Sequence, residues 1–360
     1  MPTERPPSVT TDTAAPSGGP LQEQRLQCES LGTVIDALIS TDFTARGLSR
    51  SLYQAAVSRA GYPLAMAAGL RLANEIHYGD PVLICTGWPS RSWLIQGLTE
   101  TDGPAGAAYL ARILEQCLGA TPILVVEQSL VPFAEAALSA AGLIVSDVET
   151  ARRSKNDGPY TASVAAVLPF TTEWSDARAE AAEVFDTLDP RAVVSVEMPG
   201  ANAADEFHNV TARLVPTDLV AKADALVREA ADREVVTIGI GDGGNELGFG
   251  YVADAVRSTL PKGEEIAPVT DVDVLVVSSI SNWGAVGVGA AIAAVTNKPE
   301  VLRTVDLMRI TDRLSELGAI DGLTAYVDSK NDGTNRATNE AFTEILASTV
   351  EMHLGGWNKG

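Results

Sequence analysis

The sequence predicts an α/β fold with a doubly wound, mostly parallel sheet, helices on both faces of the sheet, and a helical N-terminal segment. The first observation is a series of short, continuously apolar runs, such as residues 82–85 and 123–126, which are typical of strands buried on both faces. The second is that segments with helical spacing of apolar residues separate these runs. The third is that residues 30–78 have helical spacing before the alternation begins.

The N-terminal segment is expected to contain several helices. Apolar residues recur at helical spacing from Leu31 to Leu38 and again from Leu52 to Val57. A further helix is expected to begin at Pro63, because proline is favoured in the first turn of a helix, and to end near Gly79.

The first residues of the chain have a different composition. Residues 1–25 are rich in Pro, Ser, Thr and Gly and contain no apolar core, so we expect a disordered tail rather than a signal peptide or a membrane span. Residues 26–360 are expected to form a single α/β domain, with residues 30–78 as its helical lead-in.

The strands and helices are expected to alternate after residue 80. The expected strands are residues 82–85, 123–126, 143–145, 163–168, 192–196, 235–240 and 272–277. The expected helices are residues 104–118, 132–141, 173–188, 217–233, one from about 283, 301–317 and 338–346. Right-handed crossovers place the loop after each parallel strand at one edge of the sheet. The polar loops after Cys85, Leu168, Val196, Ile240 and Val277 are therefore expected to lie within reach of one another.

The glycine-rich stretch from Glu234 to Tyr251 is the strongest candidate for a binding loop. It begins as a β-branched strand and continues as Gly-Asp-Gly-Gly-Asn-Glu from Gly241 to Glu246. Glycine lets the backbone turn tightly and lie close to a ligand, and open α/β sheets bind ligands where strands end. The members of this loop that we expect at the site are Gly241, Asp242, Gly243, Gly244, Asn245 and Glu246.

Two other interpretations of the glycine-rich stretch are weaker. It could be a plain strand-to-helix turn with Asp242 or Asn245 as the helix cap. It could also be a dinucleotide fingerprint, since Gly239, Gly241 and Gly244 satisfy G-x-G-x-x-G. Against this, Asp242 would repel a pyrophosphate, and no acidic residue ends a following strand about 20 residues further on.

Three other segments carry polar residues where strands end. Glu100 and Asp102 precede an expected helix, and Glu197 follows the strand 192–196 directly. Ser281, Asn282 and Trp283 begin another expected helix, whose free amides could hold a carboxylate. Each segment also has a structural interpretation: Asp102, Ser281 or Asn282 could be a helix cap, and Glu197 could be bonded to backbone amides.

The long loop between Thr86 and Pro104 is a candidate lid. It exceeds the usual length of a strand-to-helix connection, and long loops commonly cover a ligand. Its Trp88, Arg91 and Trp93 are the side chains that could do so.

Charge and composition exclude several classes of function. The formal net charge of −21 argues against nucleic-acid binding, which needs lysine and arginine to neutralise phosphates. The three cysteines, Cys28, Cys85 and Cys117, form no C-x-x-C pair, so we expect a reduced, cytoplasmic protein. The histidines have no metal-binding spacing, and the sequence contains no Walker loop and no G-x-S-x-G nucleophile elbow.

Four motifs in this order resemble one known family. ETDGP at 100–104, the stretch 197–213, GIGDGGNELGFG at 239–250 and SNWG at 281–284 are similar to the C-terminal domain of D-glutamate cyclase. The resemblance covers roughly residues 30–350. It implies an α/β fold and a hydro-lyase that closes D-glutamate to 5-oxo-D-proline with loss of water. The alternative is that the chain is a binding protein and not an enzyme, namely a non-catalytic module that binds a small anionic metabolite or a nucleotide.

Roles can be assigned to the acids under the lyase hypothesis. Asp242 and Glu246 are the first candidates for proton transfer, followed by Glu100, Asp102 and Glu197, because acids with raised pKa values serve as general acids and bases. The glycine-loop amides and the helix start at Ser281–Trp283 would stabilise the oxyanion, or a divalent cation could do so. The sequence requires no other cofactor. It predicts a small-molecule substrate, no nucleic acid and no membrane, and it is compatible with a homo-oligomer.

Overall fold

The computed structural model describes residues 20–43, 45, 47–155 and 162–356. Its centre is a seven-stranded sheet of order β3-β4-β2-β1-β5-β8-β9, and every pair of neighbouring strands in it is parallel. The strands are β1 (Pro81–Thr86), β2 (Thr121–Val126), β3 (Ile144–Ser146), β4 (Val164–Pro169), β5 (Ala192–Val196), β8 (Val236–Gly241) and β9 (Val274–Val277). The predicted doubly wound, mostly parallel α/β fold is confirmed.

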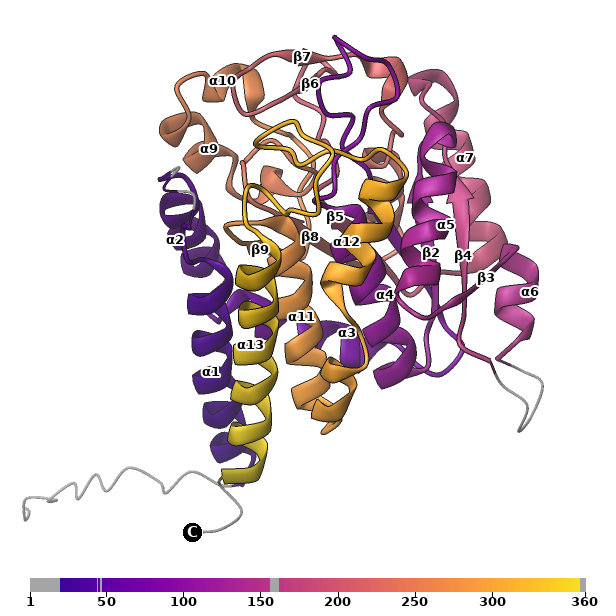
Figure 1. Ribbon diagram of the computed structural model, residues 1–360. Helices are drawn as coiled ribbons and strands as arrows, with labels where there is room; N and C mark the ends of the chain where they lie inside the picture. The colour runs from indigo at the N-terminus through magenta and orange to yellow at the C-terminus, as the bar shows by residue number, and fades with distance from the viewer. Residues whose placement is uncertain (1–19, 44, 46, 156–161, 357–360) are drawn as a thin grey trace, which may run out of the picture.

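Helices cover both faces of the sheet (Figure 1). One face is covered by α3 (Leu64–Glu75), α4 (Pro104–Leu118), α5 (Val131–Ala140) and α11 (Ser281–Val295), with α1 (Pro20–Ile39), α12 (Leu307–Glu316) and α13 (Arg336–Gly356) packed outside them. The other carries α6 (Val148–Arg153), α7 (Trp174–Leu188) and α8 (Asp224–Asp232). The remaining helices are α2 (Ser49–Ala60), α9 (Ala253–Thr259), α10 (Gly263–Ile266) and the 3₁₀ turns η1 (Gln128–Leu130), η2 (Thr217–Leu219), η3 (Phe249–Val252) and η4 (Pro299–Arg303).

The helical N-terminal segment is present. Residues 1–19 of the predicted tail lie outside the described residues, and α1 begins at Pro20, before the predicted end of the tail. In Figure 1, α1 and α13 lie side by side although they come from opposite ends of the chain. Among the described residues, no helix combines the length and the apolar character that crossing a lipid bilayer requires.

Two long helices that the sequence predicts are interrupted. The segment 217–233 divides into η2 and α8. The buried Lys222 lies between them and donates hydrogen bonds to the carbonyls of Thr217 and Val220. The segment 301–317 divides into η4 and α12, where Asp306 caps α12 by accepting from the Met308 amide at 2.9 Å. Side-chain capping of this kind stabilises a new helix start at the break.

The strand order determines where a ligand is expected to bind. The chain leaves β1 towards β2 on one side and returns to place β5 on the other side of β1. Loops after β1 and β5 therefore diverge and leave a crevice at the carboxyl ends of these strands, which is where open α/β sheets bind ligands. A short antiparallel hairpin, β6 (Phe207–His208) with β7 (Leu214–Val215), and the segment 318–335 also lie at this end, and neither was predicted.

Candidate functional site

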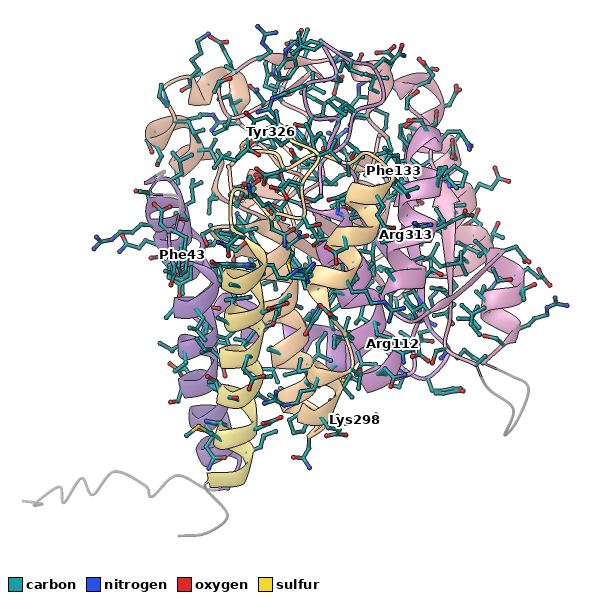
Figure 2. All side chains as sticks on the ribbon, viewed as in Figure 1. Phe43, Arg112, Phe133, Lys298, Arg313 and Tyr326 are labelled. Atoms are coloured by element: carbon teal, nitrogen blue, oxygen red, sulfur yellow. The ribbon has the colours of Figure 1, made fainter. Side chains whose placement is uncertain are left out.

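A cavity of about 280 Å³ opens at the carboxyl ends of β1, β5 and β8. The loop after β1, the residue after β5, the glycine loop after β8, the β6–β7 connection and the segment 318–335 all contribute to its wall. Figure 2 marks this end of the molecule by the exposed Tyr326 and the opposite end by Lys298. The acidic residues that line the cavity are Glu100, Glu197, Asp242, Glu246 and Asp332.

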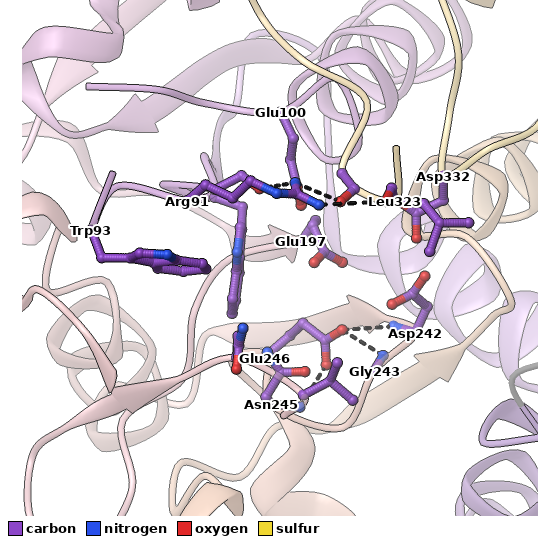
Figure 3. Close-up of a pocket in the computed structure, with 15 residues that line it drawn as sticks. Arg91, Trp93, Glu100, Glu197, Asp242, Gly243, Asn245, Glu246, Leu323 and Asp332 are labelled. Atoms are coloured by element: carbon purple, nitrogen blue, oxygen red, sulfur yellow. Dashed lines mark hydrogen bonds between the residues drawn. The ribbon is translucent and has the colours of Figure 1, made fainter. Parts of the chain in front are cut away.

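The glycine loop is shaped by the carboxyl group of Glu246. Its Oε1 accepts hydrogen bonds from the amides of Asp242 and Gly243 at 3.0 and 2.6 Å, and its Oε2 accepts from Gly244 and Asn245 at 2.7 and 2.9 Å (Figure 3). Successive backbone amides that converge in this way form an anion nest. Burial and the neighbouring Asp242 raise the pKa of Glu246 to about 7, although the amide bonds act in the opposite direction.

Glu197 follows β5 directly and has an unusual backbone conformation. Its φ angle is 45°, a left-handed value that costs a non-glycine residue energy and is found often at functional sites. The Ser281 hydroxyl donates a hydrogen bond to Glu197 Oε2. Burial, followed by the nearby carboxyl groups of Glu246 and Asp242, raises the pKa of Glu197 well above its usual range.

Asp102 and Asn282 connect two helix starts beneath the cavity. Asp102 accepts from the amides of Ser281 and Asn282 at the start of α11, at 3.0 and 2.7 Å. Asn282 Oδ1 accepts from the amides of Gly103 and Gly106 at the start of α4, at 3.0 and 2.6 Å. Each residue therefore caps the helix of the other. The sequence had left open that each caps its own helix, and the N-caps of α4 and α11 make no side-chain hydrogen bond of that kind.

Glu100 and Asp332 complete the acidic wall. Glu100 lies in an isolated parallel bridge with Ile320, which holds the segment 318–335 against the loop after β1. Burial, followed by the charges of Asp332 and Asp102, raises the pKa of Glu100 well above its usual range. Asp332 has a φ angle of 44°, which is a second left-handed value at a non-glycine residue of the cavity wall.

The acids form two overlapping groups of potential metal ligands. Carboxylate oxygens of Asp102, Asp242 and Asp332 lie within 4.8 Å of one another, and so do those of Glu197, Asp242 and Glu246. Asp242 belongs to both groups. Figure 3 shows Asp242, Asp332 and Glu197 directed towards a common space.

The loop 87–99 borders the mouth of the cavity. Arg91 donates to the carbonyls of Gly322 and Leu323 at 2.9 and 3.3 Å, so this loop holds the segment 318–335. The guanidinium of Arg213 lies 4.6 Å from the centre of the Trp93 ring, so the loop also contacts the stretch before β7. The predicted lid side chains Trp88, Arg91 and Trp93 all line the cavity.

Residues 35–346 match the sequence model of a family described as D-glutamate cyclase-like, C-terminal. The chain belongs to this D-glutamate cyclase-like family. It is also 29% identical over 231 residues to the human protein named D-glutamate cyclase, mitochondrial. That match covers 62% of this chain and 34% of the human protein, so the chain spans about a third of the length of this relative.

The predicted site residues of this cyclase-like chain occupy three kinds of position. Those that line the cavity are Glu100, Glu197, Asp242, Gly243, Asn245 and Glu246. Those that lie beneath it, buried in the backbone turns and helix starts, are Asp102, Gly241, Gly244, Ser281 and Asn282. Trp283 is fully buried and stacks on Phe342 at 4.2 Å, with its Nε1 donating to Asn339, so it packs in the core rather than against the cavity.

Sequence reasoning missed one of the acidic residues that line the cavity, and it included one loop that does not line it. Asp332 was not predicted, because no strand precedes it; the Asp-Gly pair at 332–333, a common turn signal, was the available indication. The loop after β4 does not line the cavity. The reason is the strand order, which puts β2 between β4 and β1.

Proposed function

We propose that this chain is a hydro-lyase that closes D-glutamate to 5-oxo-D-proline with loss of water. Membership of the D-glutamate cyclase-like family and the similarity to the human protein of that name support the proposal. The observation that carries it is the concentration of buried acids around one cavity of about 280 Å³, which suits a small metabolite.

The reaction needs two proton transfers at opposite ends of the substrate. The α-ammonium group must lose a proton before its nitrogen attacks the γ-carboxyl carbon. A carbon–nitrogen bond then forms and a carbon–oxygen bond breaks. The two protons lost by the ammonium group leave with the departing oxygen as water.

Acids with raised pKa values suit both transfers. We assign removal of the ammonium proton to Glu100 and protonation of the departing oxygen to Glu197. Both are buried beside other carboxyl groups, and both have a raised pKa. These roles replace the earlier expectation for Glu246, because its two oxygens already accept hydrogen bonds from backbone amides. Its part in the proposal is to hold the glycine loop in place.

The oxyanion needs a different partner from the one that the sequence suggested. The amides of the glycine loop donate to Glu246, and those at the start of α11 donate to Asp102. Backbone amides that already have a carboxylate acceptor are poorly placed to hold a developing negative charge.

A divalent cation fits this role. The two groups of acids centred on Asp242 offer only carboxylate oxygens, and hard oxygen ligands favour Mg²⁺ or Mn²⁺. When bound, such a cation would supply Lewis-acid polarisation of the γ-carboxyl group. Asp242, together with Asp102 and Asp332, would hold it, which leaves Glu197 for protonation of the departing oxygen.

The cation proposal is tested by calorimetric titration of the purified chain with MgCl₂ and MnCl₂. Asp242→Asn removes the carboxylate shared by both groups and is expected to weaken binding at least about tenfold. Asp232→Asn, a change of the same kind at an exposed position in α8, is the matched control. Equal affinity in the two variants would contradict the assignment.

The lyase proposal is tested by chiral chromatography of 5-oxo-proline formed from D-glutamate, with L-glutamate in a parallel reaction. We expect turnover of D-glutamate that falls by about 100-fold or more in Glu197→Gln. Glu135→Gln, at an exposed position in α5, should behave like the wild type. Binding of D-glutamate without turnover would instead support the non-catalytic binding module.

A further inference from the structure

The cavity has a single source of fixed positive charge. Among the described residues that line it, Arg91 alone is cationic, against the five carboxyl groups of the wall. The chain as a whole has a formal net charge of −21, so the surroundings do not compensate. An anionic ligand that enters this cavity therefore needs either a bound cation or Arg91.

The local structure fixes the Arg91 guanidinium at the cavity without neutralising it. Nη1 donates to the Gly322 carbonyl at 2.9 Å and to the Ser90 hydroxyl at 3.4 Å, and Nη2 donates to the Leu323 carbonyl at 3.3 Å. All three acceptors are uncharged oxygens. The backbone of Arg91 has a φ angle of 51°, a left-handed conformation that a non-glycine residue adopts at some energetic cost.

The position of Arg91 relative to Glu100 indicates which end of a substrate it would contact. Both residues belong to the loop after β1, and Figure 3 shows them on the same side of the cavity, facing the glycine loop that carries Asp242. In D-glutamate the ammonium group and the α-carboxylate share one carbon atom. If the ammonium group lies against the Glu100 carboxyl group, Arg91 is the cationic side chain of the same wall that is available to the α-carboxylate.

The chemistry of the two carboxyl groups favours the same assignment. The γ-carboxyl group loses an oxygen during ring closure, whereas the α-carboxylate remains an anion in the substrate and in the product. A guanidinium is protonated at every working pH and matches a carboxylate with two parallel hydrogen bonds. A permanent cation is therefore suited to the group whose charge does not change.

We propose that Arg91 binds the α-carboxylate of the substrate and determines the specificity of the site for α-carboxylated amino acids and lactams. This inference rests on the proposed function and deepens it. It distinguishes the two ends of D-glutamate, with the α-carboxylate at the loop after β1 and the γ-carboxyl group towards Glu197 and Asp242.

The test compares two ring compounds that differ only in the carboxylate. Binding of 5-oxo-D-proline and of 2-pyrrolidinone, the same lactam without its carboxylate, is measured by calorimetry or by ligand-observed NMR. The wild type should bind 5-oxo-D-proline roughly 10- to 100-fold more tightly. Arg91→Gln should bring this ratio close to one while leaving 2-pyrrolidinone binding unchanged, and Arg91→Lys should restore part of it.

The control is Arg213→Gln, which removes a second guanidinium at the mouth that contacts Trp93 but does not line the cavity. It should keep the wild-type ratio. An Arg91→Gln variant that keeps the ratio, or that loses both compounds equally, would overturn the inference, the latter because Arg91 would then only hold the segment 318–335. Turnover of D-glutamate is measured separately, so a wild type that prefers 5-oxo-D-proline but has no lyase activity would refute the proposed function and leave the role of Arg91 intact.

Discussion

Asp102 and Asn282 each cap the helix that the other begins. The Asp102 carboxylate accepts from the amide of Asn282 at 2.7 Å, and Asn282 Oδ1 accepts from the amide of Gly106 at 2.6 Å. The two sequence motifs ETDGP and SNWG are thus one structural unit, although about 180 residues separate them. This unit fixes α4 and α11 against each other directly beneath the acidic cavity.

Replacement of Asn282 by alanine should destabilise the fold more than loss of an ordinary helix cap. It would leave the buried amides of Gly103 and Gly106 without their acceptor, and it would remove the donor to Asn331 Oδ1. Unsatisfied buried groups cost about 1–3 kcal/mol each, so the two amides predict a loss of roughly 2–6 kcal/mol in the free energy of unfolding.

Asn335→Ala provides the matched comparison, measured with the same urea titration. Asn335 is exposed and caps α13 by accepting from the Thr338 amide at 3.0 Å. Its loss should cost only about 1 kcal/mol. Equal losses for the two variants would show that the reciprocal caps contribute no more than a surface cap.

Conversion to glutamine should change the stability of the protein in opposite directions at Glu246 and at Glu197. In Glu246→Gln, the NH₂ group of glutamine would replace an oxygen that accepts hydrogen bonds from two backbone amides. Both backbone N–H groups would then face another hydrogen-bond donor and lose their acceptor. We expect the free energy of unfolding to fall by roughly 2–4 kcal/mol. In Glu197→Gln the remaining oxygen can still accept from Ser281, and repulsion among buried carboxyl groups decreases.

Chemical denaturation and D-glutamate turnover, measured on the same two preparations, separate these roles. Glu197→Gln should retain or gain stability and lose activity, as expected at a site that sacrifices stability for function. Glu246→Gln should lose both. A stable, active Glu246→Gln protein would refute the view that this carboxylate organises the loop.

The fold could be predicted largely because buried parallel strands leave a direct signal. Continuous apolar runs such as residues 82–85 cannot be helix surface, so β1 was placed correctly. The breaks within residues 217–233 and 301–317 could not be predicted from apolar spacing. At these breaks Lys222 donates to a local carbonyl and Asp306 caps a new helix start. Both interactions depend on how the segments pack in the folded protein.

The site could be predicted only as far as the rule that loops after parallel strands converge. That rule placed Glu100, Glu197 and Asp242 together, since β1, β5 and β8 are neighbours. It could not place Asp332, which follows no strand of the main sheet. Nor could it show that Glu246 accepts hydrogen bonds from its own loop, because that depends on a turn geometry that the sequence of residue types does not specify.

Gly200 should tolerate no side chain. A Cβ atom there would lie 2.8 Å from the backbone of Glu246 and Leu247, which is closer than real Cβ contacts and involves atoms that cannot move aside cheaply. Gly200→Ala should therefore displace the glycine loop from the residues after β5. We expect a loss of more than about 2 kcal/mol in the free energy of unfolding together with weaker ligand binding.

Gly355→Ala is the control, because it makes the same glycine-to-alanine change at a position where the added Cβ atom has space. A Cβ atom there meets no other atom within 4 Å, and the residue lies in the last turn of α13. Alanine at this position should leave stability unchanged or raise it by at most about 1 kcal/mol. A Gly200→Ala protein as stable as Gly355→Ala would show that the two loops are not in close contact.

The buried carboxyl group of Asp36 should make stability depend on pH. Asp36 lies in α1 and accepts from the amides of Leu64 and Ala65 at 2.6 and 3.0 Å and from the Tyr53 hydroxyl at 3.0 Å. Burial raises its pKa from 3.8 to about 6, against the effect of these hydrogen bonds. The folded state therefore holds the proton more tightly than the unfolded state does. The resulting stabilisation is complete below about pH 4 and is lost as the pH rises through 6.

The shift of about two pKa units corresponds to roughly 3 kcal/mol. Asp36→Asn has no proton to release, so the difference in unfolding free energy between wild type and variant isolates this contribution. We expect urea titrations to show that the wild type gains roughly 2.5 kcal/mol relative to Asp36→Asn when the pH falls from 7 to 4. A difference that stays constant across this range would mean that Asp36 has the same pKa in the folded and unfolded chains, and that its hydrogen bonds to the start of α3 offset the whole effect of burial.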